Sequence, residues 1–438
     1  MKYRASTDMT PATPVELSAG RERALLWLLA LTQFTVIMDF MVMMPLGPQI
    51  MQAFAIGPAA FATAVSTYSW CAGLSGLFAA TYIDRFDRKR LLLFVYILFA
   101  LSNLICGMAS SFHLLLIARA FAGITGGVLG AIVMAVVSDV IPVKRRGAAT
   151  GLVMTSFSMA AIAGVPLGVV LGAKFGWQTP FYLLTAFSVV IWAIAARLVP
   201  ALNSHLAKGP TPIAEILPDL FALIRKPAHL RAFALTGMIM SSGMMVIPFV
   251  SPVLVGNHGV APQEVSWIYL AGGLATLLTS RLIGRLSDRY GKHNVFRYVS
   301  LFSILPILFI THLPDLPLLS IIAFFPLFMV SISGRSIPMQ ALMTTVPEPA
   351  RRGAFLSVNA AIQSIGTGLG AWFGGLLLSS GKGAEIIGYG MNGWCAAALT
   401  VLGVVWIQRV TSAAKPVAVT AEPVAQAVSQ PAAGPSAP

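Results

Sequence analysis

Charged side chains are scarce in this chain of 438 residues, since Asp, Glu, Lys and Arg together make up only 10% of it. Hydrophobic residues account for 57%, and the mean hydropathy is +0.82. A soluble protein of this composition could not cover its surface with polar side chains. The scarcity of charge therefore excludes an ordinary soluble domain and indicates a membrane protein.

Cysteine is also rare, with three residues in the whole chain. Cys71, Cys106 and Cys395 fall in three different apolar runs, at spacings typical of neither a metal site nor a disulfide framework. We interpret them as buried structural thiols. No Ser/His, His/Glu or paired-acid constellation lies at one membrane depth, so we expect no enzyme, no metal site and no cofactor.

Runs of about 20 apolar residues recur along nearly all of the chain, and a helix of this length crosses the hydrocarbon core of a bilayer. The sequence therefore predicts an all-α membrane protein with twelve transmembrane helices in two pseudo-symmetric six-helix bundles. The predicted helices are residues 24–46, 61–83, 91–109, 113–140, 147–172, 180–200, 231–254, 264–286, 295–312, 316–346, 353–379 and 385–409.

The second half of the chain repeats the first with an offset of 204 residues. Asp84 recurs as Asp288 and Pro48 recurs as Pro252. Such a repeat indicates two copies of one six-helix unit. The offset places Gly243 at the position of Asp39, so the two copies are not functionally equivalent.

The repeat divides the chain into two helical bundles, residues 24–200 and 231–410. Residues 201–230 join them, either as a short amphipathic helix on the cytoplasmic face or as a plain linker. Residues 1–23 and 411–438 are polar or poor in large apolar side chains, and we expect them to be disordered and cytoplasmic.

The formal net charge of +14 is distributed unevenly over the predicted loops. Lys and Arg gather in alternate loops, whereas the loops between them contain chiefly Lys174 and Lys382. This positive-inside asymmetry places both termini in the cytoplasm. We therefore interpret the charge as a sign of topology, not of a nucleic-acid partner. The first apolar run is long enough to remain as a span instead of a cleaved signal.

We place three charged residues within the membrane: Asp39 in the first predicted helix, Arg119 in the fourth and Arg335 in the tenth. A charge at such depth costs about 3 kcal/mol or more, so it should face the bundle interior or a wet cavity. The cost of burying these three charges indicates that they belong to a functional site. The alternatives are that Asp39 ties neighbouring helices together and that Arg119 extends to the membrane surface.

Other side chains in the predicted helices are candidates for a substrate cavity. Asn359 and Gln363 lie four residues apart, and either line a cavity or bond across helices. Methionines are concentrated in the first and seventh helices, which favours a hydrophobic substrate, although packing or a copper(I) pathway are alternatives. The candidate cavity residues are Thr35, Met43, Tyr68, Arg335, Gln340, Asn359 and Gln363.

Small residues recur at four-residue spacing in the fifth helix. Gly164 and Gly168 let neighbouring helices approach closely, and Pro166 frees a backbone carbonyl and permits a bend. We expect a packing face and a bend here.

These motifs, in this order, resemble those of the major facilitator superfamily, in its branch of twelve-helix drug:proton antiporters. The resemblance covers about residues 22–410. Ala80 and Asp87 stand where the family pattern G-x-x-x-D-R-x-G-R-K/R, which follows the second helix, has glycine. The residues that match this pattern are Asp84, Arg85, Arg88 and Lys89.

Two helix motifs extend the resemblance. Arg119 and Gly123 match the pattern R-x-x-x-G of the fourth helix. Asp139 stands where the family places an acid that pairs with the loop arginine, here Arg88. The segment from Gly164 to Gly168 corresponds to the antiporter signature G-P-x-x-G, in a variant that looks like the sugar-efflux subgroup.

The resemblance implies two bundles that rock around a central site lined by helices 1, 4, 7 and 10. We expect Asp39 to couple transport to protons, because a closed cavity favours its neutral form and a nearby arginine its charged form. Arg119 would modulate it, and Arg335 would contact substrate or a counter-charge. A cytoplasmic gate, or only a topological anchor, is expected from Asp84, Arg85, Arg88, Asp139, Asp288 and Arg289.

The sequence thus favours a proton-coupled exporter of a small hydrophobic or amphipathic compound. We expect a monomer in the inner (plasma) membrane of a bacterium, whose partners are the substrate, protons and the lipid bilayer. An importer that works by symport is the second hypothesis, beside a sugar or organic-anion exporter of the same fold. A membrane enzyme or sensor is the third.

Overall fold

The computed structural model describes residues 18–203, 206, 218, 221–348 and 351–411, and this part of the chain is almost entirely helical. The helices are α1 (Ala19–Val42), α2 (Gly47–Phe54), α3 (Pro58–Tyr82), α4 (Arg88–Gly107), α5 (Phe112–Val140), α6 (Val143–Met159), α7 (Val165–Phe175), α8 (Thr179–Leu198), α10 (Pro227–Met244), α11 (Val250–His258), α12 (Val265–Tyr290), α13 (Lys292–Thr311), α14 (Leu318–Met343), α15 (Arg352–Leu376) and α16 (Tyr389–Trp406).

Shorter elements connect some of these helices. Those that lie wholly within the described residues are three single turns of 3₁₀-helix, one π-helical turn and one antiparallel pair of two-residue strands. They are η1 (Ile83–Arg85), η4 (Ile247–Phe249), η6 (Ile407–Arg409), the π-helical η2 (Ala160–Gly164), and the strands β1 (Ser379–Ser380) and β2 (Ile386–Ile387).

Within the described residues, nine helical segments are long and apolar enough to cross a membrane. The pair α2 and α3, bent by 116°, makes a tenth if it is one span. Helices α12 and α15 are also long, with 26 and 25 residues. The many membrane-length helices confirm the predicted class, while the count of twelve spans stays a prediction.

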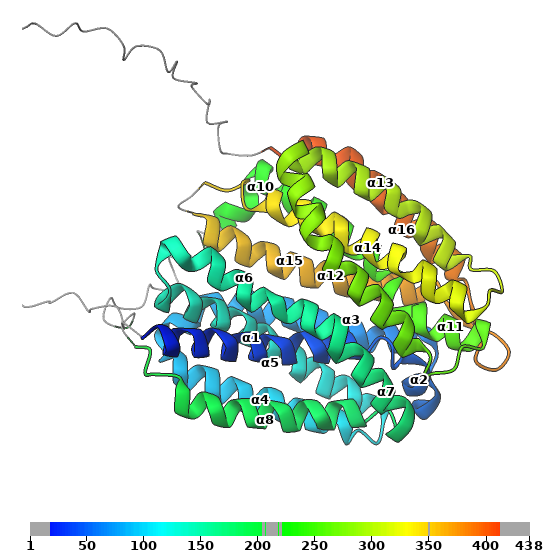
Figure 1. The fold of residues 1–438 in the computed structure, drawn as a ribbon, viewed down its shortest axis with the longest axis horizontal. Coiled ribbons are helices and arrows are strands. Elements are labelled where there is room, and N and C mark those ends of the chain that lie inside the picture. The colour runs from blue at the N-terminus through cyan, green and yellow to red at the C-terminus, as the bar shows by residue number, and fades with distance from the viewer. Residues whose placement is uncertain (1–17, 204–205, 207–217, 219–220, 349–350, 412–438) are drawn as a thin grey trace, which may run out of the picture.

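The helices form two bundles that lie side by side (Figure 1). In the first, α3 packs on α5, α4 on α8, and α1 on α6. In the second, the corresponding pairs are α12 with α14, α13 with α16, and α10 with α15. The internal repeat of the sequence is therefore a repeat of packing. Half of the segment 201–230 lies outside the described residues, including most of the predicted amphipathic stripe; of that stripe, Phe221 and Ile224 are described and lie in a helical stretch, residues 221–225.

Two seams join the bundles, α3 against α15 and α12 against η2 and α7. In the first seam the Ser66 hydroxyl donates to the Gly368 carbonyl at 2.8 Å. At one end of the molecule, where α2 meets α11, the Ser251 hydroxyl donates to the Pro45 carbonyl at 2.8 Å. The halves are thus in contact along two flanks and at this end.

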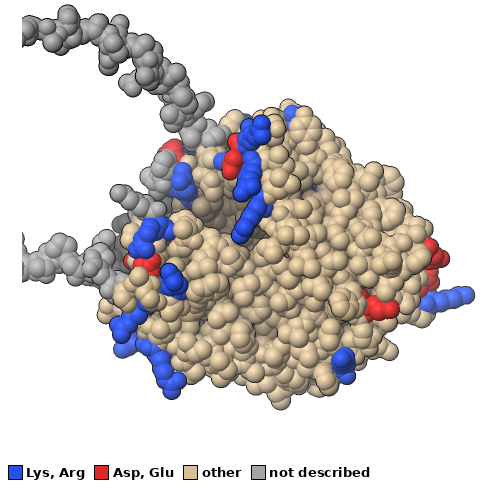
Figure 2. Space-filling model, viewed as in Figure 1, with Lys and Arg blue, Asp and Glu red and all other residues tan. Residues whose placement is uncertain are grey.

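Charged side chains gather at the other end of the molecule, where the chain enters α1 (Figures 1 and 2). The middle of the face in Figure 2 carries almost none. Helix α1 begins at Ala19, earlier than expected, and Glu22 in its first turn forms a bidentate ion pair with Arg145 at 2.9 Å. This ion pair stabilises a turn that the polar sequence alone did not predict to be helical.

The fifth predicted helix is interrupted at its glycine-rich segment. The π-helical turn η2 ends at Gly164, and Pro166 lies in the first turn of α7. A Cβ atom added at Gly168 would lie 2.3 Å from Val42 Cγ2, and one at Gly172 would lie 2.4 Å from Leu46 Cδ2. The glycines therefore allow α7 to pack directly on the end of α1 and the turn after it.

Candidate functional site

The centre of the first bundle contains an ion pair between α1 and α5. The Arg119 Nη1 atom donates to Asp39 Oδ1 at 2.6 Å, and both side chains are 0% exposed. The sequence predicted an interior position for Asp39 and left open that Arg119 extends to the membrane surface, whereas the structure buries both and brings them together. A charge-assisted hydrogen bond of this length, out of contact with water, is strong.

Tyr68 of α3 forms one wall of this ion pair. The Arg119 guanidinium lies 4.4 Å from the centre of the Tyr68 ring, which stacks on Phe40 at 5.5 Å. The close approach depends on Gly123, one turn beyond Arg119, because a Cβ atom there would lie 2.3 Å from the Tyr68 carbonyl oxygen. The R-x-x-x-G motif thus lets α3 bring an aromatic face to the arginine.

The ion pair does not use all of its hydrogen-bonding atoms. Asp39 Oδ2 and the Nε and Nη2 atoms of Arg119 are buried and have no hydrogen-bond partner among the described residues. Buried polar atoms are normally paired, and exceptions occur at functional sites. One carboxylate oxygen is therefore left for a proton, and two nitrogens for another acceptor.

Thr35 and Met43 were predicted to line a cavity, but the structure packs both inside the first bundle at 0% exposure. Thr35 donates to the Thr32 carbonyl and lies 3.1 Å from the Tyr96 hydroxyl of α4. Met43 belongs to the main hydrophobic cluster, together with Met38, Met44 and Met245. For these methionines the packing alternative describes the structure, and the support for a hydrophobic cavity is weakened.

Arg335 on α14 is buried in the second bundle at 1% exposure. Its Nη1 atom donates to Thr400 Oγ1 at 2.8 Å, and both terminal nitrogens lie 3.3 Å from Ser242 Oγ. Nη2 also donates to the Ile239 carbonyl at 3.3 Å. All of these acceptors are neutral, and within the described residues no carboxylate forms an ion pair with Arg335.

The remaining cavity candidates occupy different environments. Asn359 is buried and accepts a hydrogen bond from Thr236 of α10 at 2.8 Å, so it bonds across helices. Gln363, one turn further, is half-buried, and Gln340 is exposed near the end of α14. The structure does not bring these three side chains into one site with Asp39.

Arg88, at the start of α4, joins three elements at the charged end of the first bundle. It binds Asp84 of η1 at 2.5 Å, Asp139 of α5 at 3.0 Å and the Ile83 carbonyl at 2.7 Å. Asp87, which stands where the family has glycine, caps α4 by accepting from the Arg90 backbone N–H.

The second copy of this loop is arranged differently. Asp288 and Arg289 are exposed, as is Arg85 in the first copy. Arg289 lies over the Tyr290 ring at 5.3 Å, and in the described part of the chain Asp288 has no ion pair. The network around Arg88 is therefore a property of the first half alone.

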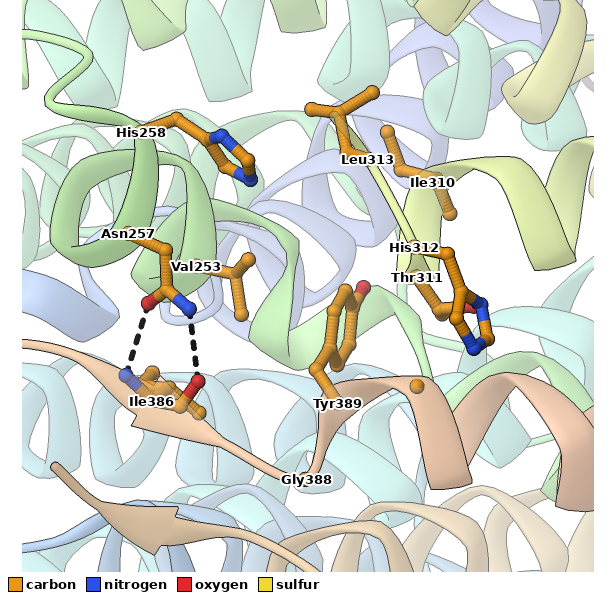
Figure 3. A pocket seen from close by; sticks show the side chains of 11 residues that line it. Val253, Asn257, His258, Ile310, Thr311, His312, Leu313, Ile386, Gly388 and Tyr389 are labelled. Atoms are coloured by element: carbon orange, nitrogen blue, oxygen red, sulfur yellow. Dashed lines mark hydrogen bonds between the residues drawn. The ribbon is translucent and has the colours of Figure 1, made fainter. Parts of the chain in front are cut away.

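Sequence reasoning missed a pocket of about 250 Å³ at the end of the second bundle (Figure 3). His258 and His312 lie on opposite sides of it, and Asn257 holds the Ile386 backbone by two hydrogen bonds of 2.8 and 2.9 Å. His258 Nδ1 lies 3.4 Å from Asp315 Oδ1. The only signal in the sequence was the polar Asn-His pair at the end of an apolar run.

The sequence model of the Major Facilitator Superfamily matches residues 29–251 and again 232–434. The chain belongs to the Major Facilitator Superfamily. It is therefore an integral membrane protein of a transporter family, as its helices indicate. The match to each half separately agrees with the internal repeat.

Relatives of known name are similar over most of the chain. A "Probable sugar efflux transporter" of Mannheimia succiniciproducens is 27% identical over 344 residues, 78% of this chain and 82% of that protein. One of Helicobacter acinonychis is 25% identical over 371 residues, 83% of this chain and 88% of that protein. An "Uncharacterized MFS-type transporter YtbD" of Bacillus subtilis is 26% identical over 298 residues, which are 67% of this chain and 73% of that protein.

Solved structures share the fold at low sequence identity. A bacterial homologue of the human lysosomal transporter Spinster, inward-facing and occupied, has a TM-score of 0.74 at 17% identity, covering 91% of this chain and 100% of that one. A D-xylose-proton symporter has a TM-score of 0.73 at 13% identity, covering 88% and 97%. These likenesses show the major facilitator fold in both halves.

Proposed function

We propose that this transporter is a proton-coupled exporter that works by alternating access, as in the drug:proton antiporter branch. The observation that carries the proposal is the buried pair of Asp39 and Arg119, in which Asp39 Oδ2 has no partner among the described residues. A carboxylate in the middle of a membrane bundle is costly and marks proton or ion pathways.

The pair can act as a two-state element. A proton on Asp39 Oδ2 makes the carboxyl neutral, so that Arg119 loses its counter-charge and keeps only the Tyr68 ring and its neutral surroundings. Breaking a buried pair by neutralising one partner costs about 3–5 kcal/mol. Proton uptake therefore weakens the contact between α1 and α5, and proton release restores it.

Export, not import, is favoured by the glycine-proline segment at η2 and α7 and by the names of the relatives, which are sugar efflux transporters. Those names also favour the sugar alternative over a hydrophobic compound. Met38 of α1, with Met43 and Met44 just after its end, is buried in the hydrophobic cluster, so these methionines no longer support a hydrophobic cavity. Symport remains the second candidate, because a D-xylose-proton symporter has the same fold.

The network around Arg88 is proposed to fix the loop between α3 and α4 at the cytoplasmic end. Asp84, Arg88 and Asp139 all come from the first half of the chain. The network therefore sets the position of the loop within one bundle. A gate would arise when the loop meets the second bundle during the cycle.

The test uses purified protein in liposomes that contain a pH-sensitive dye. A pH gradient is imposed, and glucose, lactose, glucuronate and tetraphenylphosphonium are added in turn. The proposal predicts that at least one compound triggers proton movement in the direction opposite to its own. Proton movement in the same direction would establish symport, and compound movement without protons would refute coupling.

A further inference from the structure

The buried arginines of the two halves have different kinds of hydrogen-bond partner. Arg119 has a carboxylate partner at 2.6 Å. Arg335 is equally buried, but its four contacts are with two hydroxyl groups and one backbone carbonyl, and three of them are as long as 3.3 Å. Hydrogen bonds from arginine to an anion are shorter, about 2.7–2.9 Å.

A buried cation without a counter-charge is unfavourable, because neutral oxygens replace only part of its hydration. The spanning helices of the second half offer no acid to Arg335 among the residues described. At the 204-residue offset Gly243 occupies the position of Asp39, while Arg335 stands at another position of the repeat than Arg119. Among the described residues, the second half therefore has a buried arginine but no acid at the position that supplies the counter-charge in the first half.

Gly243 brings the backbone of α10 close to the Arg335 guanidinium. A Cβ atom added at Gly243 would lie 3.3 Å from Arg335 Nη2 and 3.7 Å from Ile332 Cγ2, so the absence of a side chain at Gly243 lets the arginine lie against the backbone. Helix α10 ends at Met244, and the chain continues through η4 before α11 begins. In transporters, broken membrane helices of this kind line substrate sites, because irregular backbone is tolerated where it borders a cavity.

We propose that Arg335 binds an anionic group of the transported compound, most simply the carboxylate of a sugar acid. The inference rests on the proposed function, since alternating access must open the site to the substrate. The carboxylate would lie beside Gly243 and supply the missing counter-charge. The hydroxyls of Ser242 and Thr400 accept from Arg335 and donate to the Ala396 carbonyl at 2.8 Å, and each would exchange that carbonyl for the carboxylate by rotating.

The experiment measures binding by calorimetry on purified protein without any pH gradient. Glucuronate and gluconate are the anionic probes, and glucose is the neutral counterpart. Wild-type protein is expected to bind an anionic probe more tightly than glucose. Arg335→Gln should weaken that binding by about tenfold or more, as expected for loss of a charge-assisted hydrogen bond, and leave glucose binding unchanged.

Gly243→Asp provides a second, independent variant, with Gly243→Asn as its matched neutral control. The aspartate would neutralise Arg335 within the chain, as Asp39 does for Arg119, and so should displace the anionic probe. The asparagine has almost the same size, so a loss of binding in Gly243→Asp alone isolates charge. Both variants are first checked for the wild-type elution profile on size exclusion.

The inference is overturned if neither anionic probe binds more tightly than glucose. It is also overturned if Arg335→Gln and Gly243→Asp bind the anionic probe as tightly as wild type does. Equal loss in Gly243→Asp and Gly243→Asn would also contradict it, since bulk and not charge would then be responsible. Because binding is measured without a pH gradient, anion binding in a protein that moves no protons would refute the proposed coupling and leave this site intact.

Discussion

At the scale of single residues, the ion pair depends on a glycine that touches neither of its charges. Gly123 allows the backbone of α3 to lie against α5, and this contact places the Tyr68 ring beside Arg119. Arg119 is then enclosed by a carboxylate on one side and an aromatic face on another. The spacing of Arg119 and Gly123 therefore has a steric cause.

Gly123→Ala should destabilise the protein by about 1–3 kcal/mol, because the new methyl group overlaps the Tyr68 carbonyl oxygen. Gly130→Ala on the same helix is the control, since a Cβ atom there meets nothing within 4 Å. Thermal unfolding in detergent measures both. A Gly123→Ala protein as stable as the control would contradict the packing described for α3 and α5.

The Arg88 network supplies a second prediction at this scale. The Asp84 side chain is 65% exposed, whereas that of Asp139 is 24% exposed. Because water screens an exposed pair, Asp139→Asn should lower the midpoint of thermal unfolding more than Asp84→Asn does. Equal midpoints for the two variants would contradict the expectation that the less exposed ion pair between α4 and α5 stabilises the protein more.

At the scale of elements, the row of glycines on α7 determines how the fifth span meets the first. Gly168 faces Val42, and a Cβ atom at Gly168 would lie 2.3 Å from its Cγ2. The π-helical turn η2 before α7 and Pro166 in the first turn of α7 shift this face relative to α6. An unbroken helix would present a different face to α1 beyond the break.

A double-mutant cycle tests this contact. Gly168→Ala should destabilise the protein by about 1–3 kcal/mol by overpacking against α1. Adding Val42→Ala should recover part of that loss, because the smaller side chain makes room for the new methyl group, so the two changes are not additive. Thermal unfolding of the two single variants and the double variant measures the coupling, and strict additivity would contradict the contact.

The helices were predictable as elements because long apolar runs and the positive-inside pattern need no tertiary information. The π-helical turn was not, since Pro166 indicates only a bend and not its form. For Asn359, spacing left a cavity and a cross-helix bond equally open, and only the position of Thr236 decides between them. Likewise the sequence predicted an interior position for Asp39 and left two open for Arg119, and their pairing depends on the packing of α1 on α5.

At the scale of the whole molecule, the duplicated unit explains both the symmetry and the asymmetry of the transporter. Equivalent helices pack in equivalent pairs, and the halves meet along α3 with α15 and along α12 with η2 and α7. The charges do not follow that symmetry. The first half contains the buried ion pair of Asp39 and Arg119, whereas Arg335 in the second half has no carboxylate partner among the described residues. This division suits a proton site in one bundle and a substrate contact in the other.

The central claim is that Asp39 couples the movement of substrate to protons. The most direct measurement compares wild type and Asp39→Asn in liposomes, using the panel compound that wild type moves fastest. We predict that Asp39→Asn loses accumulation driven by a pH gradient but retains exchange of labelled for unlabelled compound. Accumulation at the wild-type level, with an unchanged dependence on pH, would contradict the claim and make the Asp39–Arg119 pair a structural contact.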